Sequence, residues 1–218
     1  MEKDCTVFTI RRLFKEDMEK IKEYSSNFDF LHFNPLNEEY IWHILLEGAF
    51  WAVLDGQKVV SVTYLLPADS TAFTQLNAAW NVIDLLDCSL ENTLLCGYVH
   101  TDSSYADRDI YTALSNLWTV QAARRGRSQM IHFIPAHIDF DLERLLNAGF
   151  ELVGLRGLDN LVPHYIFTKA VSFEKIKTQP GQQVEKCKIT DTKAISMLCE
   201  HNYRGFDMDV EKNILFRR

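Results

Sequence analysis

The sequence has few glycines and prolines, no closely paired cysteines and no long apolar run. Its 218 residues include 9 Gly and 5 Pro, which argues against a fibrous repeat and against a disordered low-complexity chain. The N-terminus Met-Glu-Lys-Asp-Cys-Thr lacks an apolar signal core, and no apolar run reaches the roughly 18 residues that a membrane span needs. We therefore expect a globular protein of the cytoplasm that has no membrane partner.

Metal-binding and nucleic-acid-binding patterns are also missing. The five cysteines form no Cys-x-x-Cys pair, and the histidines show no His-x-x-x-His spacing, so no metal site is expected. The net charge is −7, and the densest basic cluster, Arg124-Arg125-Gly126-Arg127, follows a predicted helix whose negative end suits cations. Phosphate contacts need a basic surface, so nucleic acid is not an expected partner.

Hydrophobic periodicity predicts an α/β fold with a mixed sheet and helices on its faces. Asp55-Gly56 between two β-rich runs is the strongest hairpin signal. Expected strands cover residues 7–13, 50–66 as a hairpin, 93–99, 130–134, 151–155 and 163–171, and expected helices cover 15–24, 37–46, 69–86, 110–126 and 140–147.

The texture of the sequence changes near residue 172. A linker at 177–183 precedes a strand near Cys187 and a helix capped by Asp191. We therefore divide the chain into a main domain, 1–172, and a small C-terminal extension, 173–218. So short an extension cannot bury a core alone, which leaves open whether it packs on the main domain or pairs two chains into a homodimer.

Several motifs, taken with this element order, resemble the GNAT (GCN5-related) acyl-CoA N-acyltransferase family over about residues 6–171. The motifs are Val99-His100 at a strand end, Arg108-x-Ile110 in the turn that follows, Ala123-x-x-Gly126 and Asn147-Ala-Gly149-Phe150. The resemblance implies a GNAT-like sheet whose two central strands splay apart, with acetyl-CoA as co-substrate. It also implies an acceptor amine on a small molecule or peptide.

The resemblance implies roles for two groups of residues. The main chain of Gly97, Tyr98 and Val99 would bind the pantetheine arm as if it were a strand, and its N–H groups would polarise the thioester. The pyrophosphate would lie on the turn and on the start of the next helix, which free N–H groups make an anion site. That second group is Ala106, Asp107, Arg108, Asp109, Ile110, Tyr111 and Thr112.

The turn departs from the family pattern Gln/Arg-x-x-Gly-x-Gly/Ala. Its three diagnostic places hold Ala106, Asp109 and Tyr111, so the small residues that let phosphate approach the backbone are missing. Asp107 and Asp109 favour the positive helix end and can cap its N–H groups themselves, while Arg108 offers a cation. Two hypotheses follow: an N-acetyltransferase, or a non-catalytic binding module whose cofactor turn has closed.

The catalytic residues of the family are only partly present. The place of the family's frequent carboxylate falls at Thr93, so Glu91, two residues upstream, becomes the candidate base, acting through water. The place of its Tyr acid falls at Leu145. Phe30 and Phe33, between the first two helices, and Tyr98 are the candidate acceptor-binding residues, and they favour an apolar or aromatic acceptor.

Overall fold

The computed structural model describes residues 8–21, 38–71, 73, 82–87, 89–97, 99–105, 110–136, 139–157, 163–171 and 182–218. The strands are β1 (Thr9–Leu13), β2 (Ala49–Asp55), β3 (Lys58–Pro67), β4 (Thr93–Cys96), β5 (His100–Thr101), β6 (Gln129–Pro135), β7 (Glu151–Arg156), β8 (His164–Ala170), β9 (Val184–Lys188), β10 (Arg204–Met208) and β11 (Asn213–Arg217). The α-helices are α2 (Glu38–Glu47), α4 (Ile110–Arg124), α5 (Asp139–Asn147) and α6 (Thr192–Glu200).

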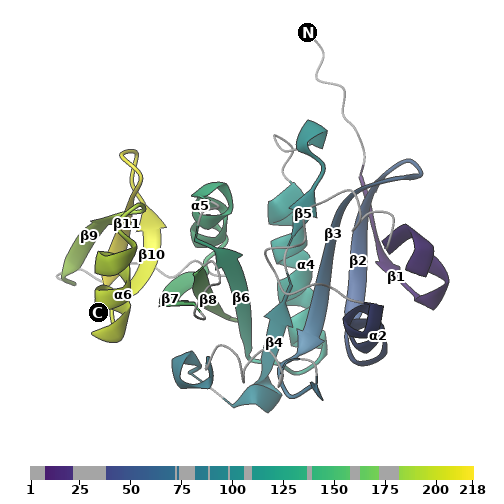
Figure 1. The fold of residues 1–218 in the computed structure, drawn as a ribbon, viewed down its shortest axis with the longest axis horizontal. Coiled ribbons are helices and arrows are strands. Elements are labelled where there is room, and N and C mark those ends of the chain that lie inside the picture. Colours follow the sequence, from purple (N-terminus) through teal and green to yellow (C-terminus); the bar gives the residue numbers. More distant parts are fainter. Residues whose placement is uncertain are drawn as a thin grey trace, which may run out of the picture.

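One mixed sheet runs through the described chain from end to end (Figure 1). Its order is β1-β2-β3-β4-β6-β8-β7-β10-β11-β9, with β5 paired to β3 beside β4. The ladder between β4 and β6 is parallel, and the other ladders along this order are antiparallel. The predicted mixed α/β sheet is therefore confirmed, and its single parallel pair lies at the centre.

Most predicted elements are present in the described chain. The hairpin turns between Asp55 and Lys58 with Gly56 at φ +59°, and helices α2, α4 and α5 match their predicted ranges to within a few residues. Half of the predicted helix over 69–86, residues 72 and 74–81, lies outside the described residues; Thr71 and Phe73 near its start are helical, and its end is a 3₁₀ turn at Ile83–Leu85. Of the predicted helix over 15–24, residues 22–24 lie outside the described part.

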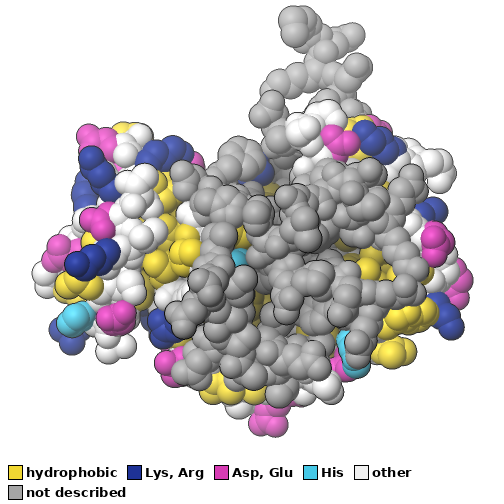
Figure 2. Space-filling model, in the orientation of Figure 1, with side chains coloured by type: hydrophobic (Ala, Val, Ile, Leu, Met, Phe, Trp, Pro, Cys, Tyr) yellow, Lys and Arg dark blue, Asp and Glu magenta, His cyan; other side chains and the backbone are white. Residues whose placement is uncertain are grey.

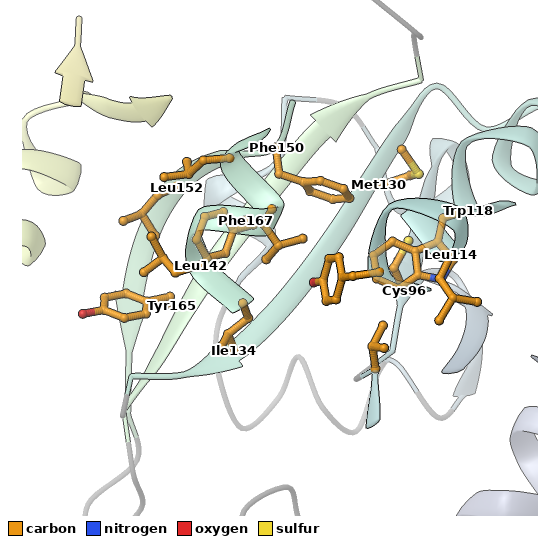
Figure 3. Close-up of a cluster of buried hydrophobic side chains, with 14 of the residues drawn as sticks. Cys96, Leu114, Trp118, Met130, Ile134, Leu142, Phe150, Leu152, Tyr165 and Phe167 are labelled. Carbon is orange, nitrogen blue, oxygen red and sulfur yellow. The ribbon is translucent and has the colours of Figure 1, made fainter. Parts of the chain in front are cut away.

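The two central strands are buried on both faces, as their uniformly apolar sequences predict. On one face, Cys96 and Met130 pack with Leu114 and Trp118 of α4 in a cluster that continues to Phe150 (Figure 3). The opposite face packs against α2 and against parts of the segment between β3 and β4. Its cluster includes Leu95, Ile131, Phe133, Ile41, Ile44, Phe73 and Val82.

The C-terminal segment extends the sheet. Asp191 caps α6 as predicted, accepting a hydrogen bond from the Ala194 N–H at 3.0 Å, whereas β10 and β11 were not predicted. Strand β10 lies antiparallel to β7 with Gly205 opposite Leu152. A Cβ atom on Gly205 would lie 3.1 Å from the Leu152 Cβ of β7 and 2.8 Å from a methyl of Ile214 in β11, so the glycine permits the close approach to both neighbouring strands. The extension thus shares its core with the main sheet.

Charged side chains of both signs are interspersed over the described surface in the view of Figure 2. No helix in the described ranges is long and apolar enough to cross a membrane.

Candidate functional site

The neighbouring strands β4 and β6 part after four paired residues. Their parallel ladder runs from Thr93 opposite Gln129 to Cys96 opposite His132 and stops there. Beyond it, β6 continues for three residues that pair with β8. The segment that follows β4 instead pairs with β3, by way of β5. We call the place where Gly97 and Val99 have left the ladder with β6, beside residues 133–135, the strand parting. It confirms the predicted splay of the central strands.

A β-bulge accompanies the strand parting. Cys96 pairs with Leu65, and His100 pairs with Val62. Three residues therefore separate the two pairs on this segment, against two residues on β3. One extra residue therefore stands between β4 and β5. Bulges of this kind are over-represented next to active sites, where they redirect a main chain or a side chain.

Gly97 gives both of its main-chain polar groups to β3. Its N–H donates to the Tyr64 carbonyl at 2.7 Å, and its carbonyl accepts from the Thr63 hydroxyl at 3.1 Å. The expectation that the Gly97 N–H would polarise a thioester is therefore not met, because that hydrogen is already engaged. Val99 is buried and belongs to neither ladder, and Tyr98 lies outside the described residues.

The side chain of His132 lies at the apex of the strand parting. Its Nδ1 is 2.6 Å from the Cys96 carbonyl oxygen, and its ring stacks at a tilt 5.1 Å from the ring of Trp118. Burial in this apolar setting lowers the pKa of His132 to about 4, although the hydrogen bond to Cys96 opposes the shift. The imidazole is therefore neutral at physiological pH.

The start of α4 faces the same region. Ile110 and Tyr111 bury their side chains in the core, and Thr112 is exposed. The Tyr111 ring packs edge-on to Trp118 at 5.9 Å, so its bulk points into the core. Of the other predicted pyrophosphate-binding residues, Ala106, Asp107, Arg108 and Asp109 lie outside the described residues.

Glu91 lies at the other end of β4. It belongs to a 3₁₀ turn, Leu90–Asn92, that leads into the strand, and its carboxylate is exposed beside the Ser89 hydroxyl. The four residues of β4 separate this turn from Gly97, a span of roughly 13 Å at strand spacing. The structure therefore does not bring the predicted base to the strand parting.

The remaining predicted positions do not contribute described side chains to the strand parting. Thr93 and Leu145 are fully buried in the core, and the acceptor candidates Phe30 and Phe33 lie outside the described residues. In the part of the chain that the structure describes, no group of three His, Cys, Asp or Glu side chains could hold a metal ion. The strand parting and the start of α4 therefore form the candidate site.

Sequence reasoning missed the link between Cys96, His132 and Tyr111. The structure shows His132 as a buried histidine of the core whose two ring nitrogens both have partners. A histidine within a buried apolar strand was the available signal. Its partner is a main-chain carbonyl 36 residues away, which no local pattern can indicate.

The fold and the site geometry can be compared with known structures. The sequence matches no protein-family model and no curated protein. The fold, however, is similar to that of Arabidopsis thaliana NAA60 in complex with acetyl-CoA, at 13% identity and a TM-score of 0.56 over 75% of this chain and 98% of that one.

Two bacterial structures show the same similarity. The Salmonella typhimurium yncA, a putative acetyltransferase with its cofactor acetyl-CoA, is 15% identical, with a TM-score of 0.56 over 77% of this chain and 95% of that one. A probable acetyltransferase from Staphylococcus epidermidis is 10% identical, with a TM-score of 0.59 over 76% and 100%. Other similar structures are described as acetyltransferases of the GNAT family. The chain therefore has a GNAT fold.

Proposed function

We propose that this protein is an N-acetyltransferase that moves an acetyl group from acetyl-CoA to an amine of a small molecule or peptide. The observation that carries the proposal is the strand parting beside a one-residue bulge, within the fold of proteins solved with acetyl-CoA. A ligand arm that enters between two parted strands can use main-chain groups that a continuous ladder would have consumed.

The proposed chemistry is a direct attack of the amine on the thioester carbonyl. The C–S bond breaks as the C–N bond forms, and the thiolate leaves as the thiol of CoA after it takes a proton. Gly97 does not donate to the developing oxyanion, because its N–H is bonded to Tyr64. The proposal therefore assigns that donor to the main-chain N–H of Val99, together with that of Tyr98. Such donors typically contribute 10²–10³ in rate.

The proton of the attacking amine passes to solvent in this proposal. Glu91 is separated from the strand parting by the length of β4, which is too far for direct proton transfer. Glu91→Gln is then expected to retain most of the activity. A loss of a hundredfold or more would restore Glu91 as a base that acts through water.

Calorimetric titration with acetyl-CoA and with CoA, followed by release of free thiol in the presence of an amine panel, tests the function. The panel should include an arylalkylamine, a polyamine and a short peptide with a free N-terminus. Binding of acetyl-CoA and amine-dependent release of thiol are expected. Absence of binding at millimolar acetyl-CoA would rule out the proposed acetyltransferase function.

A matched pair of variants tests the oxyanion donor. Val99→Pro removes the N–H group, whereas Val99→Ala keeps it and shortens the side chain. The proposal expects Val99→Pro to lose about a hundredfold or more in kcat and Val99→Ala to stay near the wild-type rate. Equal rates in two folded variants would refute the role of Val99.

The second candidate is a non-catalytic module with a closed cofactor turn. The specific observation in its favour is the sequence of the turn, which places Asp109 and Tyr111 where the family pattern has small residues. It predicts no response to acetyl-CoA or CoA in the same titrations. Either way, we place the protein in the cytoplasm, in keeping with the free thiols of Cys96, Cys187 and Cys199.

A further inference from the structure

A chain of three buried groups connects the start of α4 to the apex of the strand parting. The Tyr111 hydroxyl lies 3.4 Å from Nε2 of His132, and Nδ1 of the same ring lies 2.6 Å from the Cys96 carbonyl oxygen. All three residues are at most 3% exposed. Tyr111 belongs to the first turn of α4, and Cys96 is the last residue of β4.

The partners fix the tautomer of the ring. A carbonyl oxygen can only accept a hydrogen bond, so Nδ1 of His132 carries the proton and donates to Cys96. The neutral ring then has a bare Nε2, which accepts a longer and weaker bond from the Tyr111 hydroxyl. The direction of donation therefore runs from the helix through the ring to the strand.

The bond to Cys96 bears on how two strands can part inside a core. A buried carbonyl without a partner is costly, and native proteins pair nearly all such groups. Cys96 is the last β4 residue in the ladder with β6, and its carbonyl is satisfied by a side chain of the neighbouring strand. Since Cys96 is also paired within that ladder, the bond from His132 is an added contact that fixes the end of β4 against β6 at the residue where the ladder stops.

We propose that His132 is a positioning residue that holds the strand parting open before any ligand binds and ties it to the first turn of α4. Both surfaces that a thioester carrier would use, the main chain after β4 and the amides at the start of α4, are then kept in one relative geometry. Trp118 and Phe150 hold the ring in place from the helix side, at centroid distances of 5.1 Å and 6.4 Å. This inference rests on the proposed function.

Substitutions at His132 separate a positioning role from simple packing. His132→Asn keeps an N–H donor close to the place of Nδ1 and loses the acceptor for Tyr111, whereas His132→Leu removes both groups. We expect His132→Leu to bind CoA about tenfold or more weakly, and both His132→Asn and Tyr111→Phe, which lose the bond to α4 and keep a donor to Cys96, to stay within about threefold of wild type. His164→Leu, at another fully buried histidine of the sheet, is the control and should leave CoA affinity unchanged.

Rescue by asparagine decides the outcome. If His132→Asn binds CoA as poorly as His132→Leu, or if His132→Leu binds as wild type, the inference is overturned. Nitrogen NMR of the ligand-free wild-type protein gives a readout that requires no variant to fold. It should show the Nδ1–H tautomer of His132, and an Nε2–H tautomer would overturn the inference.

The two proposals fail differently. If wild type binds no CoA, the proposed function fails, while the tautomer and hydrogen exchange at Cys96 to Val99 still test the geometry. In the ligand-free protein the Val99 amide is expected to exchange faster than the paired amides of β4. Equal protection of both would show that the strands are joined and would remove the role of His132.

Discussion

Gly97→Ala is expected to destabilise the protein through one contact, the ring of Tyr64. A Cβ atom built on Gly97 would lie 2.3 Å from two carbons of that ring, whereas carbon atoms normally stay about 3.5–4.0 Å apart. The ring is buried and packs edge-on to Phe50 at 5.8 Å, so it must shift by roughly 1 Å against its own neighbours. Overpacking of this kind typically costs about 1–3 kcal/mol.

Urea unfolding followed by tryptophan fluorescence measures the effect. With an m-value of about 2–3 kcal/mol/M for a chain of this size, the midpoint should fall by roughly 0.5–1 M. In a Tyr64→Leu background the ring is gone, so the added cost of Gly97→Ala should drop below about 0.5 kcal/mol, a coupling of about 1–2 kcal/mol. If Gly97→Ala costs the same in both backgrounds, the Tyr64 contact is not the reason for glycine at this position.

Gly126→Ala is the matched control. Gly126 has φ +67°, and a Cβ atom there would meet nothing within 4 Å. Its expected cost of about 1–2 kcal/mol comes from backbone strain alone, so it should be the same with and without Tyr64. A rescue of Gly126→Ala by Tyr64→Leu would mean that the cycle reports a global effect.

Three further predictions concern pH and the C-terminal extension. Because the pKa of His132 in the folded protein is lowered to about 4, the unfolded chain binds more protons between about pH 4 and 6.5, and the free energy of unfolding should fall by about 3 kcal/mol at most as pH falls through that window. His132→Asn should flatten this pH dependence. An unchanged slope for the variant in urea melts at pH 4 to 7 would contradict the burial argument. Arg217 pairs with Glu151 where both side chains are 15% exposed or less, so Arg217→Met should lower the free energy of unfolding by about 3 kcal/mol. Arg204→Met, whose partner Asp87 is 59% exposed, should lower it by about 1 kcal/mol or less. Equal losses would mean that the ion pairs do not stabilise the docking of the extension. Truncation after Ser172 removes Ile214 and Phe216 from the shared core and leaves β7 as an edge strand. Light scattering should therefore detect association of the shortened chain. A stable monomer would show that the main domain folds independently.

Local patterns predicted the elements well, because each depends on residues that are close in sequence. The Asp55-Gly56 hairpin, the Asp191 cap and the stop of α4 near Gly126 all follow from short-range chemistry. The family motifs also located the strand parting at residues 97–99, although the strand signal itself ran on without a break from 93 to 99.

Features set by distant partners were not predictable. The bulge after Cys96 depends on register with β3, about 30 residues earlier in the chain. Strands β10 and β11 have the sequences Arg-Gly-Phe-Asp-Met and Asn-Ile-Leu-Phe-Arg, which are short and mix charges with apolar residues. They become strands because β7 offers an edge and Gly205 lets β10 approach it.

The geometry separates two halves of the proposed cofactor site. The strand parting rests on groups within the sheet, namely the Cys96 bond to His132 and the Gly97 bonds to β3, none of which needs the missing small residues of the turn. Tyr111 likewise turns its ring inward. The loss of those residues should therefore weaken recognition of the pyrophosphate and leave recognition of the pantetheine arm intact.

Fragments of the cofactor test this separation. Asp107 and Asp109 would each oppose a pyrophosphate by about 1–4 kcal/mol at 4–6 Å, for effective dielectrics of 80 to 20. Acetyl-pantetheine, which lacks the nucleotide half, should therefore bind within about tenfold of acetyl-CoA. Asp109→Asn should strengthen acetyl-CoA binding and leave acetyl-pantetheine binding unchanged. If loss of the nucleotide half abolishes binding, the phosphates supply most of the affinity, and the turn works as an anion site despite its two carboxylates.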